Sequence, residues 1–171
     1  MLNKQSGILA LSIALAAASG SVSAVTQGTV GATSTGNVNV QVVVPSLIRI
    51  TDLADIDLGS YTGDGLDMTG TSPACVRRNS AGNYGIVATS TNGSFALAGG
   101  VVAGTVPYSV SWGGSALTYN TSLGAQVADS GTLGACTPVA GKLSVTVTGA
   151  SLDAAEPDTY TDTLILTVTP E

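Results

Sequence analysis

Cys75 and Cys136, the two cysteines of this 171-residue chain, are the side chains best suited to covalent chemistry. A redox or metal-binding pair is disfavoured, because they are far apart in sequence and the chain contains no histidine. Without histidine, neither a Ser-His-Asp nor a Cys-His catalytic arrangement can be assembled. In an oxidising compartment we expect one structural disulfide, which would close a loop of about 60 residues and stabilise the fold by about 4 kcal/mol.

The segment TDLADIDLGSYTGDGLDM, residues 51–68, is the second place where side chains could do chemistry. Its aspartates are Asp52, Asp55, Asp57, Asp64 and Asp67. Paired carboxylates serve glycosidases and clustered ones bind calcium, but the spacing here is not that of an EF-hand loop. Acidic loop residues more often solvate turns, so we expect no metal site, no cofactor, no catalytic residue and no enzymatic activity.

The charge balance is acidic, with 5 Lys and Arg against 11 Asp and Glu and a net charge of −6. Nucleic acid and anionic membrane surfaces are therefore poor partners. Arg77 and Arg78, beside Cys75, could meet an acidic partner, but we expect a solvated, exposed pair.

The first 24 residues have the pattern of a secretory signal. Lys4 supplies a positive charge, residues 8–18 form a short apolar run, and Val22-Ser23-Ala24 offers small residues for cleavage. The run is shorter than the roughly 20 residues that a membrane helix needs. We expect cleavage after Ala24 and an exported chain with one domain.

The elements that must position these residues are strands. Apolar residues alternate with polar ones in six segments, residues 46–51, 83–89, 94–97, 107–112, 142–148 and 163–169. Clusters rich in Gly, Asn and Asp separate them, and residues 151–155 suggest only a turn. Strands of this length and spacing predict an all-β fold, and we favour an immunoglobulin-like antiparallel sandwich.

The stretch GNVNVQVVVP, residues 36–45, precedes these strands and alternates most regularly. Val38, Val40, Val42 and Val44 share one face, and their full burial would contribute about 6 to 12 kcal/mol of gross transfer free energy. The stretch could be the first strand of its own domain. Alternatively, it could be a strand meant for another molecule, because a Gly- and Thr-rich segment near the signal site detaches easily from the body.

Two segments resemble the ends of the archaic chaperone-usher pilins and the related spore coat protein U domain. They are TGNVNVQVVV, residues 35–44, and DTYTDTLILTVTPE, residues 158–171. PYSVSWGG, residues 107–114, also resembles the alpha class of chaperone-usher pilins. The resemblance implies an immunoglobulin-like domain, residues 45–171, that lacks its last strand, preceded by an N-terminal extension, residues 25–44.

In those families a strand donated by the next subunit fills the gap, which implies that Val38, Val40, Val42 and Val44 form the donor strand here. A domain short of one strand exposes an apolar groove between unpaired edges, and filling it from a neighbour grows an open filament. The implied partners are identical or related pilin subunits, a periplasmic chaperone and an outer-membrane usher.

The resemblance thus implies a structural pilin, exported through the periplasm to a pilus on the cell surface, where it supports adhesion or biofilm formation. The alternative is a surface adhesin or coat subunit that binds a carbohydrate or an abiotic surface through exposed loops. Tyr61, Trp112 and Tyr119 are the aromatics available for such binding, although the strand parity of Trp112 predicts burial.

Overall fold

The computed structural model describes residues 25–131, 133–134 and 136–171. The expected secretory signal, residues 1–24, lies outside the described residues. The chain divides into two units between Val44 and Pro45, and each unit is described by itself below.

Residues 25–44 contain one antiparallel bridge, between Thr26 and Asn37. The Thr26 amide donates to Asn37 Oδ1 at 2.9 Å, and the Asn37 amide donates to the Thr26 carbonyl at 3.0 Å. The alternating valines that follow lie in no strand and are exposed, with exposed fractions of 71% for Val38, 92% for Val40, 83% for Val42 and 73% for Val44. Burial of this apolar face as a donor strand stays a prediction.

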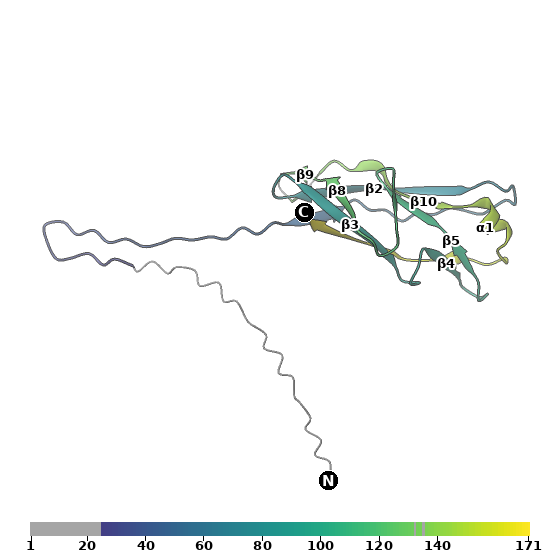
Figure 1. Ribbon diagram of the computed structural model, residues 1–171, viewed down its shortest axis with the longest axis horizontal. Coiled ribbons are helices and arrows are strands. Elements are labelled where there is room, and N and C mark those ends of the chain that lie inside the picture. Colours follow the sequence, from purple (N-terminus) through teal and green to yellow (C-terminus); the bar gives the residue numbers. More distant parts are fainter. Residues whose placement is uncertain (1–24, 132, 135) are drawn as a thin grey trace, which may run out of the picture. The chain divides into compact units, whose positions relative to one another are not determined.

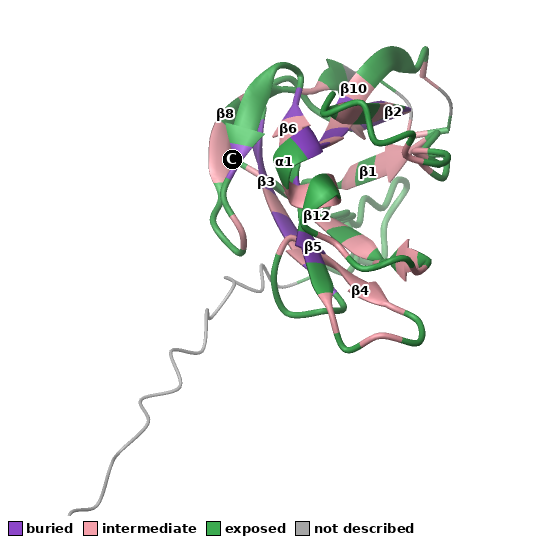
Figure 2. Cartoon of the chain, turned by 90° about the vertical axis from the view of Figure 1, so that its right-hand side faces the viewer, coloured by how far each residue is buried: buried purple, intermediate pink, exposed green. Residues whose placement is uncertain are grey.

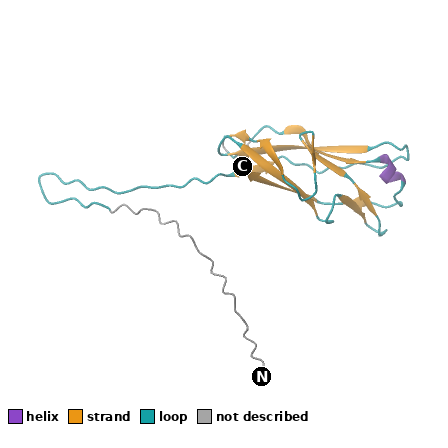
Figure 3. Cartoon of the chain, in the orientation of Figure 1, coloured by secondary structure: helices purple, strands orange, loops and turns teal. Residues whose placement is uncertain are grey.

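Strands are the main regular structure of residues 45–171, and nearly all of their pairings are antiparallel (Figures 1 and 3), which confirms the predicted all-β class. The strands are β1 (Ile48–Thr51), β2 (Met68–Arg78), β3 (Asn83–Ser90), β4 (Ala96–Gly99), β5 (Thr105–Pro107), β6 (Ser109–Trp112), β7 (Ser115–Leu117), β8 (Leu123–Val127), β9 (Asp129–Ser130), β10 (Val139–Val147), β11 (Tyr160–Thr161) and β12 (Leu164–Pro170). A short helix, α1 (Gly149–Asp153), follows β10, and its N-cap Thr148 accepts a hydrogen bond from the Ser151 amide.

These strands form three sheets. The largest has the order β1-β2-β10-β6-β7, and β9 pairs with β2 in parallel. The second has the order β12-β3-β8 and the third β11-β4-β5. In the described part of the chain β1 and β12 are therefore edge strands, each with one side of its backbone outside any ladder.

The core is formed by buried residues of the largest sheet and of β3, with half-buried residues of β12 packed against them, as the burial colours of Figure 2 indicate. Trp112 on β6 and Tyr84 on β3 are both fully buried, and Trp112 Nε1 donates to Tyr84 Oη at 2.8 Å. A buried indole N–H needs such a partner, since an unpaired one is costly. The predicted burial of Trp112 is confirmed.

The segment predicted as one strand over residues 107–112 is instead two strands, β5 and β6, which meet at Tyr108. Tyr108 donates its amide to the Phe95 carbonyl at 3.0 Å, in register with the pairing of β4 and β5, and the chain changes its partner strand after this residue. Consequently β5 pairs with β4, whereas β6 pairs with β10 and β7.

The two cysteines lie on the largest sheet and beside it. Cys75 is buried on β2, Cys136 precedes β10, and the two form a disulfide with their Cα atoms 6.2 Å apart. That separation is within the usual range for a disulfide. The bond ties the segment before β10 to the middle of the domain.

Candidate functional site

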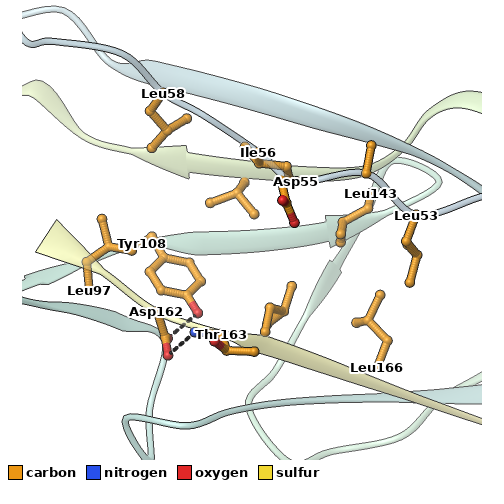
Figure 4. A pocket seen from close by; sticks show the side chains of 13 residues that line it. Leu53, Asp55, Ile56, Leu58, Leu97, Tyr108, Leu143, Asp162, Thr163 and Leu166 are labelled. Atoms are coloured by element: carbon orange, nitrogen blue, oxygen red, sulfur yellow. Dashed lines mark hydrogen bonds between the residues drawn. The ribbon is translucent and has the colours of Figure 1, made fainter.

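An open groove, here called the edge groove, runs between residues 53–58 and the start of β12. Residues 53–58 continue the path of β1, and the cavity beside them has a volume of about 300 Å³. Most of its lining is aliphatic, and Figure 4 shows these side chains converging from both sides. The lining residues are Leu53, Ala54, Asp55, Ile56, Leu58, Leu97, Tyr108, Leu143, Val145, Asp162, Thr163, Leu164 and Leu166.

One wall of the edge groove is held against β2. The Ala54 amide donates to Oγ of the fully buried Ser72 at 2.8 Å. Further along, Ile56 packs directly over Gly70, where a Cβ would collide with Ile56 and would come within 2.9 Å of Leu58 Cδ2. The missing side chain of Gly70 therefore lets this wall sit close to the sheet, with Ile56 and Leu58 turned to the groove.

The other wall is β12. Leu164, Leu166 and Val168 point toward the core and are only half-buried, while Ile165 and the threonines between them are exposed. β12 pairs with β3 along its whole length, from Leu164 opposite Ser90 to Pro170 opposite Tyr84. Because the opposite edge of β12 has no ladder among the described residues, its N–H and C=O groups are open to an added strand.

A hydrogen-bonded pair of side chains, Tyr108 and Asp162, lies at the groove. Tyr108 Oη donates to Asp162 Oδ2 at 2.6 Å, and the Thr163 amide donates to Asp162 Oδ1 at 2.7 Å. Burial raises the pKa of Asp162, but hydrogen bonds, chiefly from Tyr108, outweigh burial and hold that pKa below its usual value. Burial raises the pKa of Tyr108, and the hydrogen bond to Asp162 raises it further. The pair is thus a carboxylate fixed by a neutral phenol.

The edge groove continues into a second cavity of about 780 Å³. The two cavities share Ile56, Leu58, Leu97 and Asp162. Tyr61 and Tyr160 line the second cavity, and both hydroxyls donate hydrogen bonds within the domain. Tyr61 Oη donates to Asp153 Oδ1 at 2.6 Å, and Tyr160 Oη donates to the Glu156 carbonyl at 2.9 Å. The groove is therefore long, and its lining becomes more polar beyond Leu58.

The five aspartates predicted to solvate turns are separated by the fold. Only Asp55 lines the edge groove. Asp57 and Asp64 accept amide hydrogen bonds within their own turns, from Gly59 at 2.8 Å and Leu66 at 3.0 Å, and Asp67 accepts from the Gly149 amide at 2.9 Å. Within residues 25–131, 133–134 and 136–171 no three acidic, Cys or His side chains are grouped to hold a metal ion.

The predicted exposure of Arg77 and Arg78 is wrong. Arg78 is 5% exposed, and its guanidinium donates to the carbonyls of Asn83 and Glu171 and, at 3.2 Å, to Ser46 Oγ. Arg77 forms an ion pair with Asp129 at 2.6 Å. The pattern missed this because a buried arginine needs carbonyl partners from remote segments, which local sequence does not show.

The aromatics considered for surface binding are mostly engaged inside the domain. Trp112 is buried, and the Tyr119 ring packs edge-on against Phe95 with centroids 5.3 Å apart. Tyr61 is held by Asp153 at the second cavity. The arrangement thus gives little support to an exposed aromatic binding loop.

Comparison with protein-family models finds no match for this sequence, and neither does comparison with curated proteins. In the described part of the chain, no helix is both long and apolar enough to cross a bilayer. Half-buried aliphatic side chains beside the open edge of β12 suit an extended segment whose alternate residues are apolar.

Proposed function

We propose that this protein is a pilin-like structural subunit that completes its fold with a strand donated by another copy. The single observation that carries the proposal is the edge groove, bounded by the unpaired edge of β12 and by residues 53–58. An apolar groove with free ladder groups aggregates unless a strand fills it. A strand from a neighbour pairs with the backbone and buries its alternate side chains.

The order of the strands supports an immunoglobulin-like sandwich that lacks one strand. In that fold one sheet has the order A-B-E-D and the other has C, F and G side by side. Here β1-β2-β10-β6 matches the first order, and β3 beside β12 matches C and F. The position of strand G, next to F, corresponds to the free edge of β12.

The same chain offers a segment that suits this position. The side chains of β12 that turn to the core, Leu164, Leu166 and Val168, recur every second residue. Val38, Val40, Val42 and Val44 have the same period and are exposed. A strand places alternate side chains on one face, so the valine face could fill the groove while Asn39 and Gln41 stay in solvent.

Repeated head-to-tail donation yields an open filament when the rotation between successive subunits does not close into a ring. The resemblance to chaperone-usher pilins supports assembly of such a filament through a periplasmic chaperone and an outer-membrane usher, and its display on the cell surface. The filament would then support adhesion or biofilm formation.

The test removes the extension and restores it as a peptide. Residues 45–171 alone should aggregate or stay partly unfolded, should become soluble with the peptide GNVNVQVVV, and should never polymerise. In the full exported chain, Val40→Asp with Val42→Asp should abolish polymerisation, because a carboxylate buried in an apolar groove costs several kcal/mol.

The matched control is Asn39→Asp with Gln41→Asp, which adds the same charge on the other face and should leave polymerisation intact. Sedimentation and circular dichroism give the readouts. If residues 45–171 form a stable monomer that does not bind the peptide, the domain is complete by itself and the proposal is wrong.

A further inference from the structure

Under the proposed function, the valine segment, residues 38–44, has two grooves that it can fill, that of a neighbouring chain and that of its own chain. The valine segment is joined to β1 by only Pro45, Ser46 and Leu47. A segment on so short a tether has an effective concentration in the millimolar range for its own groove, provided the tether can reach. Unless the tether resists folding back, each chain would fill its own groove and no filament would grow.

Folding back requires a tight turn at residues 45–47. β1 uses one of its edges to pair with β2. For the valine segment to enter its own groove, it must run antiparallel to β1 beside the other edge. Pro45 and its neighbours would then have to form a β-hairpin turn.

The side chain of Asn79 opposes that turn by bonding both ends of the tether. Asn79 Nδ2 donates to the Pro45 carbonyl at 2.8 Å, and Asn79 Oδ1 accepts from the Leu47 amide at 2.9 Å. The Asn79 amide also donates to the Leu47 carbonyl at 3.2 Å. Together these bonds extend the β1–β2 ladder past Ile48 and hold the tether along β2.

Ser46, between Pro45 and Leu47, is held as well, because the Arg78 guanidinium donates to Ser46 Oγ at 3.2 Å. The residue types agree with an extended tether. Tight hairpin turns need positive φ, which Asn and Gly supply, whereas the ring of Pro45 fixes φ near −65° and biases Val44 toward an extended conformation. Backbone chemistry and side-chain contacts therefore oppose the same turn.

We propose that Asn79, assisted by Arg78, is a specificity-determining residue that keeps Pro45–Leu47 extended and so reserves the groove for the strand of another chain. The inference rests on the proposed function and adds to it the feature that decides whether the valine segment fills its own groove or that of a neighbouring chain. Asn79 acts on the tether, and it makes no contact that the filling of the groove itself requires.

The test uses the whole exported chain, residues 25–171, refolded at one concentration. Asn79→Ala releases the tether, and Pro45→Asn with Ser46→Gly creates a favourable two-residue turn. The control is Asn83→Ala, an exposed asparagine at the same end of the domain. Sedimentation measures monomer against polymer, and a fluorescent GNVNVQVVV peptide reports whether the groove of each monomer is still open.

For Asn79→Ala we expect the ratio of closed, peptide-refusing monomer to polymer to rise about tenfold, as the loss of one to two hydrogen bonds implies. The turn-forming double variant should raise it further, whereas Asn83→Ala should match the parent chain. Thermal unfolding of each variant checks that the body of the domain is intact.

The proposal is overturned if both tether variants polymerise and bind peptide as the parent does, and in that case the groove retains its proposed function. It is also overturned if the parent chain is itself a closed monomer that opens only when residues 25–44 are removed. Failure of the proposed function looks different, because residues 45–171 would then be stable and would ignore the peptide.

Discussion

The guanidinium of Arg78 contacts three segments that are remote in sequence, namely Ser46, Asn83 and Glu171. Gly82, with a φ of +141°, leaves room for it, since a Cβ there would lie 2.7 Å from Arg78 Nη1. One buried charge thus joins the entrance to β1, the start of β3 and the residue after β12. Sequence patterns predicted exposure because none of these partners is a local neighbour.

Asp162 holds the phenol of Tyr108 at the edge groove. Asp162→Ala should destabilise the domain by about 1 to 3 kcal/mol, because Tyr108 Oη loses its acceptor while it stays buried. Asp162→Asn keeps an acceptor and should cost less. Urea unfolding at pH 7 compares the two variants, and equal losses would contradict this role for the carboxylate.

The hydrogen bonds that hold the pKa of Asp162 below its usual value also make stability depend on pH. The carboxylate is favoured in the folded state, so its contribution is complete above about pH 4 and disappears as the pH falls through the folded-state pKa. Between pH 5 and pH 2, the parent chain should lose more stability than Asp162→Asn. Parallel unfolding curves of the two proteins across that range would contradict the prediction.

Among the elements, strands with one buried face were the predictable ones. β3, β10 and β12 lie within three residues of the predicted segments, because their apolar residues alternate. β2 was missed although it is the longest strand and lies in the interior of the largest sheet. Its buried end, from Ser72 to Arg78, has consecutive buried residues and includes Pro73, so it carries no period of two.

An apolar groove was predicted from the resemblance to pilins, but the residues that line it were not. It forms where residues 53–58 lie opposite residues 162–166, and nothing in the sequence of either segment predicts that the two are neighbours. Gly70 lets Ile56 approach β2. From the sequence alone, a glycine within a strand indicates only a locally less stable strand. The resemblance to pilins predicts a missing strand, whereas the residues that line the edge groove are known only from the fold.

β12 allows a prediction that separates its two faces. Leu166 lines the edge groove, whereas Ile165 is 46% exposed on the opposite face. Leu166→Ser should weaken binding of the GNVNVQVVV peptide to residues 45–171 by about tenfold or more, since a buried aliphatic side chain is worth about 1.5 to 3 kcal/mol. Ile165→Ser should change binding little. Fluorescence titration measures both, and equal losses would show that the peptide does not bind at this groove.

For the whole molecule, the disulfide between Cys75 and Cys136 spans 61 residues of sequence. Replacing both cysteines by alanine should lower the free energy of unfolding by about 2 to 5 kcal/mol. Urea unfolding of peptide-filled protein gives the measurement, and adding a reductant to the parent should reproduce the loss. A double variant as stable as the parent would mean that the bond adds no stability.

The free edge of β12 has a mechanical consequence. Ladder hydrogen bonds lie perpendicular to their strands. A strand seated beside β12 and pulled along its axis would load all of these bonds together in shear, whereas a strand peeled from one end would break them one at a time. A chain of such subunits should therefore resist tension far better than peeling, and each link should stay closed under a steady pull until its whole ladder fails at once.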